Sequence, residues 1–239
     1  MVRLEKKFIP ESRANRRAYA PGSAYYQKFR IMDYITIHDV GSDGYERGYD
    51  PDWFHWYIAV DKSTENPARN RKAWHFTVGS EKVIQHLRVD EVGLHAGDGL
   101  FGGVLNGNSN SIGIEMCKAS TKSIQDRIIT NTAWLCSQLI KQNKVGKRFP
   151  EGMKQHFDWT QKNCPAVLRS RPNGWNDFLD EIDNFLNPTP APAPEIDPNL
   201  FYRVIAGSYN EIENARRVET ELKNLGYSAF ILPFRRGGS

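Results

Sequence analysis

The chain has 239 residues, of which 39% are hydrophobic and 25% charged, the composition of an ordinary globular protein. Its length predicts one main domain with a small appendage. The net charge of +4 suits an anionic polymer, either nucleic acid or cell wall, but the excess is too small to decide between them. No apolar run approaches a membrane span, and the N-terminus lacks the apolar core of a signal peptide, so membrane insertion is not expected.

Five short runs rich in β-branched and aromatic residues predict strands, because each is bounded by residues that favour turns. They cover residues 34–40, 56–61, 73–79, 82–87 and 110–117. Apolar residues at helical spacing predict helices at 126–143 and 174–186. Strands interspersed with helices predict an α/β fold with a mixed central β-sheet flanked by helices.

Alternating prolines mark one domain boundary. The sequence NPTPAPAPEIDP at 187–198 predicts an extended spacer between a large domain at 1–186 and a small module at 199–239. The module predicts a strand at 201–207, a helix at 211–226 capped by Gly226, and a second strand at 227–234. A unit of about forty residues is marginally stable alone.

The three cysteines cannot all pair within the chain, which argues against a disulfide framework and for synthesis in a reducing compartment. Cys117 follows an apolar run and Cys136 lies within a helical pattern, so both are predicted to be buried thiols. Cys164 lies in the polar segment HFDWTQKNCP, at 156–165.

This segment can fold back so that the imidazole of His156 and the thiolate of Cys164 meet at one metal ion. A hydrolytic zinc site uses three protein ligands and leaves a fourth position open. His38 is the best third candidate, because it ends a predicted strand and strand ends present functional side chains. Two alternatives stay open: the loop pair can be structural, and His38 can be a half-buried histidine bonded to the backbone.

Five motifs follow one another along the chain: YITIH, WHF, GLHAG, NSIGIE and HFDWTQKNCP. Together they resemble the zinc-dependent N-acetylmuramoyl-L-alanine amidases, a group that includes bacteriophage lysozyme-amidases and peptidoglycan recognition proteins. The resemblance implies the amidase fold, a Zn²⁺ cofactor, and zinc ligands at His38, His156 and Cys164. It also places a catalytic lysine at Lys162 and the acidic residue that closes the SIGIE strand at Glu115.

Amide hydrolysis needs an activated water, a proton shuttle and stabilisation of the oxyanion. We expect Glu115 to act as the base and Lys162 to stabilise the negative charge that develops on the carbonyl oxygen. Members of the family that only bind peptidoglycan commonly lose the cysteine ligand. The presence of Cys164 therefore favours catalysis.

Three further residues are expected to contact the substrate. Trp74 stands where some family members carry a catalytic tyrosine, and it offers an N–H donor but no exchangeable proton. His95 matches the histidine at the groove of the family, and Asn110 belongs to a polar loop that is either a turn or a wall of the groove. The remaining histidines are predicted to be packed, surface or structural residues: His55, His75 and His86.

The tail resembles one β-α-β half of a SPOR-type repeat, a module that binds peptidoglycan glycan strands. A full repeat holds two halves, so we expect the strand edges of the tail to pair with a second copy or to dock on the main domain. Self-association through the tail is therefore an expectation.

The sequence thus predicts a peptidoglycan hydrolase, a phage endolysin that cleaves the amide between N-acetylmuramic acid and L-alanine. A bacterial autolysin and a non-catalytic peptidoglycan receptor are the alternatives. No recognition motif supports nucleic-acid binding. Without a signal peptide, the protein is expected to be made in the host cytoplasm and to reach the cell wall after release.

Overall fold

The computed structural model describes residues 2–40, 50–60, 72–97, 106–188 and 205–233. The chain divides into two compact units, Met1–Thr189 and Pro190–Ser239. Most of the predicted linker at 187–198 lies outside the described residues. In the part of the chain that the structure describes, no helix is both long and apolar enough to cross a membrane.

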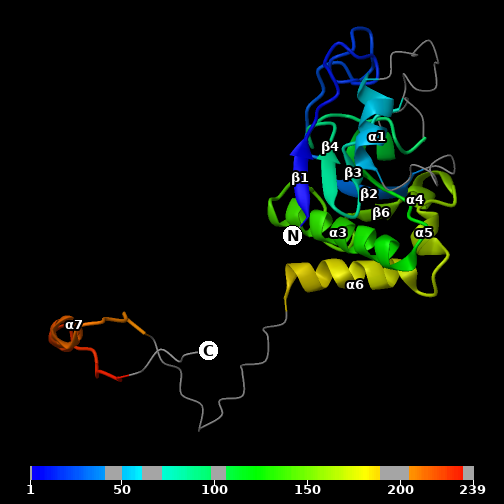
Figure 1. The fold of residues 1–239 in the computed structure, drawn as a ribbon. Coiled ribbons are helices and arrows are strands. Elements are labelled where there is room, and N and C mark those ends of the chain that lie inside the picture. The colour runs from blue at the N-terminus through cyan, green and yellow to red at the C-terminus, as the bar shows by residue number, and fades with distance from the viewer. Residues whose placement is uncertain (1, 41–49, 61–71, 98–105, 189–204, 234–239) are drawn as a thin grey trace. The chain divides into compact units, whose positions relative to one another are not determined.

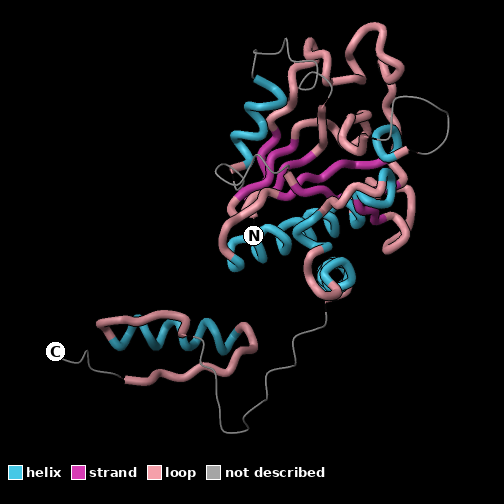
Figure 2. Tube along the Cα trace, turned by 90° about the vertical axis from the view of Figure 1, so that its right-hand side faces the viewer, coloured by secondary structure: helices cyan, strands magenta, loops and turns pink. Residues whose placement is uncertain are grey.

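A six-stranded mixed sheet forms the centre of the first unit (Figure 2). In spatial order the strands are β1 (Arg3–Lys6), β4 (Lys82–Gln85), β3 (Phe76–Val78), β5 (Ser111–Met116), β2 (Tyr34–Asp39) and β6 (Met153–Gln155). Neighbouring strands run parallel except for β3 and β4. The predicted mixed central sheet is confirmed, and β1 and β6 are two short strands that the sequence pattern did not reveal.

Two long helices lie on one side of this sheet. Figure 1 shows α3 (Lys122–Lys141) running along the sheet and α6 (Gly174–Leu186) running beside α3. The bounds of α6 are those predicted, whereas α3 begins earlier than the predicted segment 126–143. Apolar residues of α3 and α6, such as Ile128 and Phe178, join the apolar residues of the strands in one continuous core.

The strand predicted at 56–61 is wrong for its described part, residues 56–60. Helix α1 (Pro51–His55) continues there into the π-helical turn η2 (Trp56–Val60). Asp50 accepts a hydrogen bond from the backbone N–H of Asp52, and proline occupies the first helical position. These two helix-start signals outweigh the β propensity of the residues that follow, so those residues continue the helix as a π-helical turn.

The described part of the first unit holds three further short helices: α2 (Gly107–Asn110), α4 (His156–Thr160) and α5 (Ala166–Arg169). Helix α4 occupies half of the segment 156–165, where the sequence pattern predicted no helix. A capping box starts it, in which the backbone N–H of Gln155 donates to the carboxylate of Asp158 over 2.8 Å.

The second unit contains the predicted helix, α7 (Ile212–Asn224). Gly226 ends it with a φ of +89°, and the backbone N–H of Tyr227 donates to the carbonyl of Leu222 over 3.0 Å. The described parts of the two predicted strands, 205–207 and 227–233, are not strands. Ile205 and Phe230 are 79% and 69% exposed, so within this described part neither segment has a partner to pair with.

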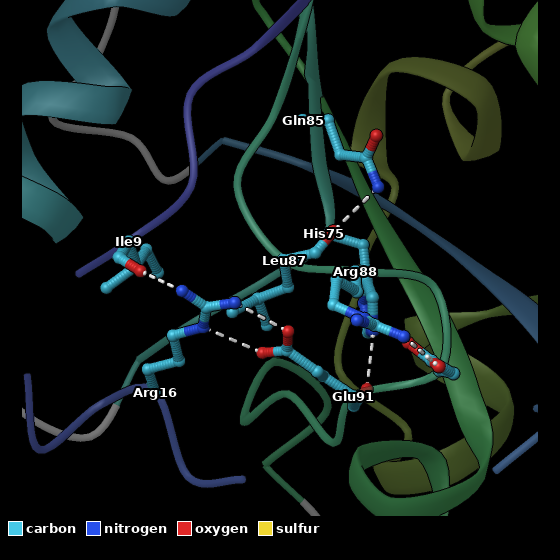
Figure 3. A network of polar contacts seen from close by, with 8 residues as sticks. Ile9, Arg16, His75, Gln85, Leu87, Arg88 and Glu91 are labelled. Atoms are coloured by element: carbon cyan, nitrogen blue, oxygen red, sulfur yellow. Dashed lines mark hydrogen bonds and ion pairs between the residues drawn. The ribbon is translucent and has the colours of Figure 1, made fainter. Parts of the chain in front are cut away.

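A buried ion pair holds the N-terminal segment against the loop that follows β4 (Figure 3). The guanidinium of Arg16 donates to both carboxylate oxygens of Glu91 over 2.9 and 2.7 Å, and to the carbonyl of Ile9 over 2.6 Å. The two side chains are 6% and 0% exposed. The bidentate geometry offsets the desolvation of both charges, and the loss of one partner would leave the other charge buried alone.

We therefore predict that Glu91→Gln lowers the free energy of unfolding by about 3–5 kcal/mol, because it leaves the Arg16 charge without a buried counter-ion. Asp90→Asn is the matched control, because Asp90 forms a more exposed pair with Arg88 on the same loop, and it should cost about 0–1 kcal/mol. Denaturant unfolding of both variants measures the difference. Equal losses in the two variants would contradict the role given to the buried pair.

Candidate metal centre

Parallel strand pairing brings three chemically active residues into one row at the end of the sheet. The register of β2 with β5 places His38 beside Glu115. The register of β2 with β6 places Ile37 beside Gln155, the last residue of β6. The residues that follow this pair, His38 in β2 and His156 at the start of α4, therefore lie at the same level. The sheet itself therefore sets the spacing of the first two predicted ligands.

The third predicted ligand reaches the same point. The Nδ1 atoms of His38 and His156 lie 2.9 Å apart, and the Sγ of Cys164 lies 4.0 Å from the Nδ1 of His38. One ligand atom from each of the three side chains falls within 4.8 Å of the others. All three side chains are buried, including that of Cys164, which lies in a polar segment of the sequence.

The donor set and its spacing fit a zinc ion. Two nitrogens and a sulfur are common zinc ligands, and at tetrahedral angles their separations are about 3.3 Å for N···N and about 3.6 Å for N···S. Burial lowers the pKa of His38 well below its ordinary value, which keeps the imidazole neutral as a ligand must be. Burial raises the pKa of the Cys164 thiol, which disfavours the thiolate. A bound cation would stabilise the thiolate that a zinc site needs.

Backbone contacts hold the cysteine in place. The N–H of Asp39 donates to the Sγ of Cys164 over 3.5 Å, and the carbonyl of Cys164 accepts the N–H of Phe157 over 3.0 Å. The carboxylate of Asp39 accepts the N–H of Val167 at the start of α5 over 2.9 Å. The segment therefore folds back between α4 and α5, as the sequence predicts.

Helix α4 packs on the face of β2 that carries His38. The indole N–H of Trp159 donates to the hydroxyl of Thr36 over 2.9 Å, and its ring meets that of Tyr34 edge-on at 5.6 Å. Tyr34, Thr36 and His38 thus share one face, as strand alternation predicts. These contacts attach the helix that begins with His156 to the strand that ends with His38.

Glu115 brings a carboxylate to the same row. Its Oε2 atom is buried and has no hydrogen-bond partner among the described residues. Burial, followed by the negative charge of Asp39, raises the pKa of Glu115 to about 8. The exposed side chain of Lys162 opposes this shift with its positive charge, and that charge also acts on His38 and Cys164. A carboxyl group and a cation therefore accompany the cluster.

His95 lies against a predicted metal ligand. Its Nδ1 is 2.9 Å from the Nε2 of His38, and its Nε2 is 3.2 Å from the carbonyl oxygen of Ser111. Burial lowers the pKa of His95 to about 3, so its ring is neutral. The sequence placed His95 at the substrate, and the structure gives it a contact with His38 that no sequence pattern indicated.

Two predicted substrate contacts lie in the interior instead. Trp74 is 5% exposed, and its indole N–H donates to the hydroxyl of Thr77 over 2.7 Å. Asn110 is 4% exposed, and its amide donates to the carboxylate of Asp33 over 2.9 Å. Both side chains use their polar atoms to support the sheet, so in this structure they do not form a wall of the site.

The other histidines are structural, as predicted. The Nδ1 of His75 accepts the N–H of Gly113 over 2.9 Å, and its Nε2 lies 2.8 Å from the carbonyl of Glu91. The rings of His55 and His86 stack at 5.4 Å. Cys117 and Cys136 are free and buried, which confirms that prediction.

Comparison with known proteins finds relatives that share one name. The curated relatives include the N-acetylmuramoyl-L-alanine amidases CwlH and XlyA of Bacillus subtilis (strain 168). CwlH is 33% identical over 194 residues, which are 81% of this chain and 66% of CwlH. XlyA is 30% identical over 183 residues, which are 74% of this chain and 50% of XlyA. The chain thus spans about half to two-thirds of the length of these relatives.

Solved structures give the same result. The catalytic domain of XlyA matches with a TM-score of 0.58 and 28% identity, over 76% of this chain and 99% of that domain. A mutant endolysin from Bacillus subtilis matches with a TM-score of 0.58 and 29% identity, over the same shares. A sequence model described as N-acetylmuramoyl-L-alanine amidase matches residues 28–167, which include every residue of the cluster. The chain therefore belongs to the N-acetylmuramoyl-L-alanine amidase family.

Proposed function

We propose that this protein is a zinc-dependent N-acetylmuramoyl-L-alanine amidase that hydrolyses bacterial peptidoglycan. The observation that carries the proposal is the convergence of the ligand atoms of His38, His156 and Cys164 beside the carboxylate of Glu115. Family membership adds the substrate class, because the curated relatives carry the name of this activity. The bond to be broken is the amide between the lactyl group of N-acetylmuramic acid and L-alanine.

His38, His156 and Cys164 would hold the zinc ion through two neutral imidazoles and one thiolate. When bound, zinc supplies the Lewis acidity that makes water a nucleophile near neutral pH and polarises a carbonyl group. The thiolate neutralises one of the two positive charges of the ion. A second cation nearby, Lys162, is therefore tolerated at the site.

The proton transfers fall to Glu115. Its unpaired Oε2 accepts a proton as the oxygen of water bonds to the carbonyl carbon, and the same carboxyl group then gives that proton to the leaving nitrogen. The C–N bond breaks, and the products are a lactyl carboxylic acid and the free amine of the stem peptide. Burial, which raises the pKa of Glu115, favours retention of this proton until it passes to the leaving nitrogen.

Lys162 is the residue proposed to stabilise the oxyanion. Negative charge develops on the carbonyl oxygen as water adds, and the ammonium group of Lys162 stabilises it. The position of Lys162 two residues before a ligand ties this charge to the cluster, and its influence on His38, Glu115 and Cys164 supports the same role.

We place the activity at the cell wall. The proposed setting is that of a phage endolysin made in the host cytoplasm and released at lysis, with a bacterial autolysin as the alternative. One solved relative is itself named an endolysin. A receptor that binds peptidoglycan without cleaving it is the rival from another class, and the retained set of two histidines and one cysteine speaks against it.

The tail is proposed as an anchor on the glycan strands. The exposed apolar residues around α7 offer a surface for a wall polymer or for a second tail: Ile205, Tyr209, Ile212, Leu225, Tyr227, Phe230 and Leu232. An anchor joined by an extended proline-rich spacer raises the local concentration of an enzyme on an insoluble substrate.

The first prediction concerns the ligands. His38→Ala, His156→Ala and Cys164→Ala should each abolish release of stem peptides from purified peptidoglycan, because two ligands hold zinc poorly. After digestion of peptidoglycan by the unmodified protein, mass spectrometry should show stem peptides with a free N-terminal L-alanine. His55→Ala, at a half-buried histidine outside the cluster, is the control and should keep the activity. Full activity after removal of zinc by a chelator would contradict the proposal.

The second prediction separates chemistry from metal binding. Glu115→Gln should retain about one zinc per chain and lose turnover by about 10²-fold or more, because it removes the acid–base group. Lys162→Met should also retain the metal and lose about 10²-fold through weaker stabilisation of the oxyanion. Glu81→Gln and Lys144→Met, both at exposed positions, are the matched controls. Natural turnover in Glu115→Gln would move the acid–base role to another residue.

The third prediction concerns the tail. A protein that ends at Asn187 should keep its zinc and its activity on soluble muropeptides, while less of it should sediment with intact walls. Light scattering of the full and shortened proteins tests self-association, since only pairing through tails gives a mass above one chain that falls on truncation. Equal co-sedimentation of the two proteins would exclude the anchor.

A further inference from the structure

The ring of His95 joins a metal ligand to the backbone of the sheet. Its Nδ1 faces the Nε2 of His38 at 2.9 Å, and its Nε2 faces the carbonyl oxygen of Ser111 at 3.2 Å. Both of its nitrogens are therefore engaged with protein atoms. His38 in turn uses Nε2 toward His95 and Nδ1 toward His156 and Cys164.

The carbonyl of Ser111, at the end of these contacts, determines which atom donates in each hydrogen bond. A carbonyl oxygen only accepts, so the Nε2 of His95 must carry the proton that it donates to Ser111. A neutral ring has one N–H, which leaves a lone pair on the Nδ1 of His95. That lone pair accepts from the Nε2–H of His38, and the Nδ1 of His38 is then unprotonated where the ligand atoms meet.

We propose that His95 is a positioning residue. Because its ring donates to the Ser111 carbonyl, it can only accept from His38, and it thereby holds His38 in the tautomer that presents a lone pair to the metal. This inference rests on the proposed function, because it takes His38 as a zinc ligand. It assigns His95 to the support of His38 and replaces the substrate contact expected from the sequence. Partners of this kind behind a ligating histidine affect metal affinity by about 10–100-fold.

The surroundings of His95 are built to hold the ring in this place. The side-chain oxygen of Asn108 accepts the backbone N–H of both His95 and Ala96, each over 2.7 Å. On the strand side, a Cβ at Gly113 would lie 2.5 Å from the Cγ of His95, so only glycine leaves room for the ring. The backbone clamp and the missing side chain together set the distance from His95 to His38.

Two substitutions separate the two ring nitrogens of His95. Asn places an oxygen near the position of Nδ1, so His95→Asn keeps an acceptor for His38 and loses the donor to Ser111. Gln places an amide N–H near the position of Nε2, so His95→Gln keeps that donor and loses the acceptor. The affinity for zinc, measured on the full chain by competition with a chromophoric chelator, should fall about 10–100-fold in His95→Gln and much less in His95→Asn.

A second measurement reports the tautomer without reference to activity. The ¹⁵N chemical shifts of the His38 ring in the zinc-free natural protein should show a protonated Nε2 and an unprotonated Nδ1. The same pattern is expected in His95→Asn, and a mixture of tautomers in His95→Gln. A protonated Nδ1 in the natural protein, or equal zinc affinities of the natural protein and His95→Gln, would overturn the inference. A natural protein that binds no zinc would instead overturn the proposed function.

Gly113 provides an independent test that leaves the imidazole intact. Gly113→Ala should weaken zinc binding by displacing the ring of His95, and the same change should have no further effect in a His95→Ala background, where no ring is in the way. Thermal unfolding of all four proteins identifies any that fail to fold. An equal effect of Gly113→Ala in both backgrounds would show that it acts on the strand rather than through His95, and would count against the inference.

Discussion

The parallel register of β2 with its two neighbours is the constraint on which the site depends. His38 is 118 residues from His156 in the sequence, and only the alignment of β2 with β6 brings the ends of the two strands to one level. The alignment of β2 with β5 adds Glu115 to the same row. A slip of one residue in either pairing would turn these side chains to the opposite face of the sheet, so the metal centre requires this register.

The two faces of β2 meet different environments, and this division explains why polar groups can be buried around the site. Ile35 and Ile37 belong to the hydrophobic core. On the other face, Thr36 is fully buried but shares hydrogen bonds with Ser111 and Trp159. Each of these polar groups has a partner, so the cost of burying them is offset. Glu115 keeps one buried oxygen without a partner among the described residues, which costs stability, and the proposed catalytic role explains why such a group is kept.

The three candidate metal ligands could be predicted from the sequence because their positions are distinctive. His38 ends a strand with clear alternation, and His156 and Cys164 flank a segment that ends in proline, so the cluster could be predicted. Helix α6, with strong helical spacing, was predicted with its observed bounds. The strand predicted at 56–61 failed because a helix-start signal at Asp50 and Pro51 outweighs the β-branched residues that follow it.

What the sequence could not supply depends on contacts between distant elements. Strands β1 and β6 are four and three residues long, too short for alternation to be read. The contact of His95 with His38 joins residues that are 57 positions apart and follows from the sheet, and so does the burial of Trp74. The strands expected in the tail need a partner strand to form, and the sequence of one tail says nothing of that partner.

The metal centre itself admits the most direct test. The full chain, purified without metal, would be loaded with one equivalent of zinc and studied by zinc K-edge X-ray absorption, with Cys164→Ser as the matched variant. We expect one zinc with two nitrogen ligands at about 2.0–2.1 Å and one sulfur at about 2.3 Å, and loss of the sulfur shell in Cys164→Ser. A zinc environment without sulfur in the natural protein, or one that Cys164→Ser leaves unchanged, would contradict it.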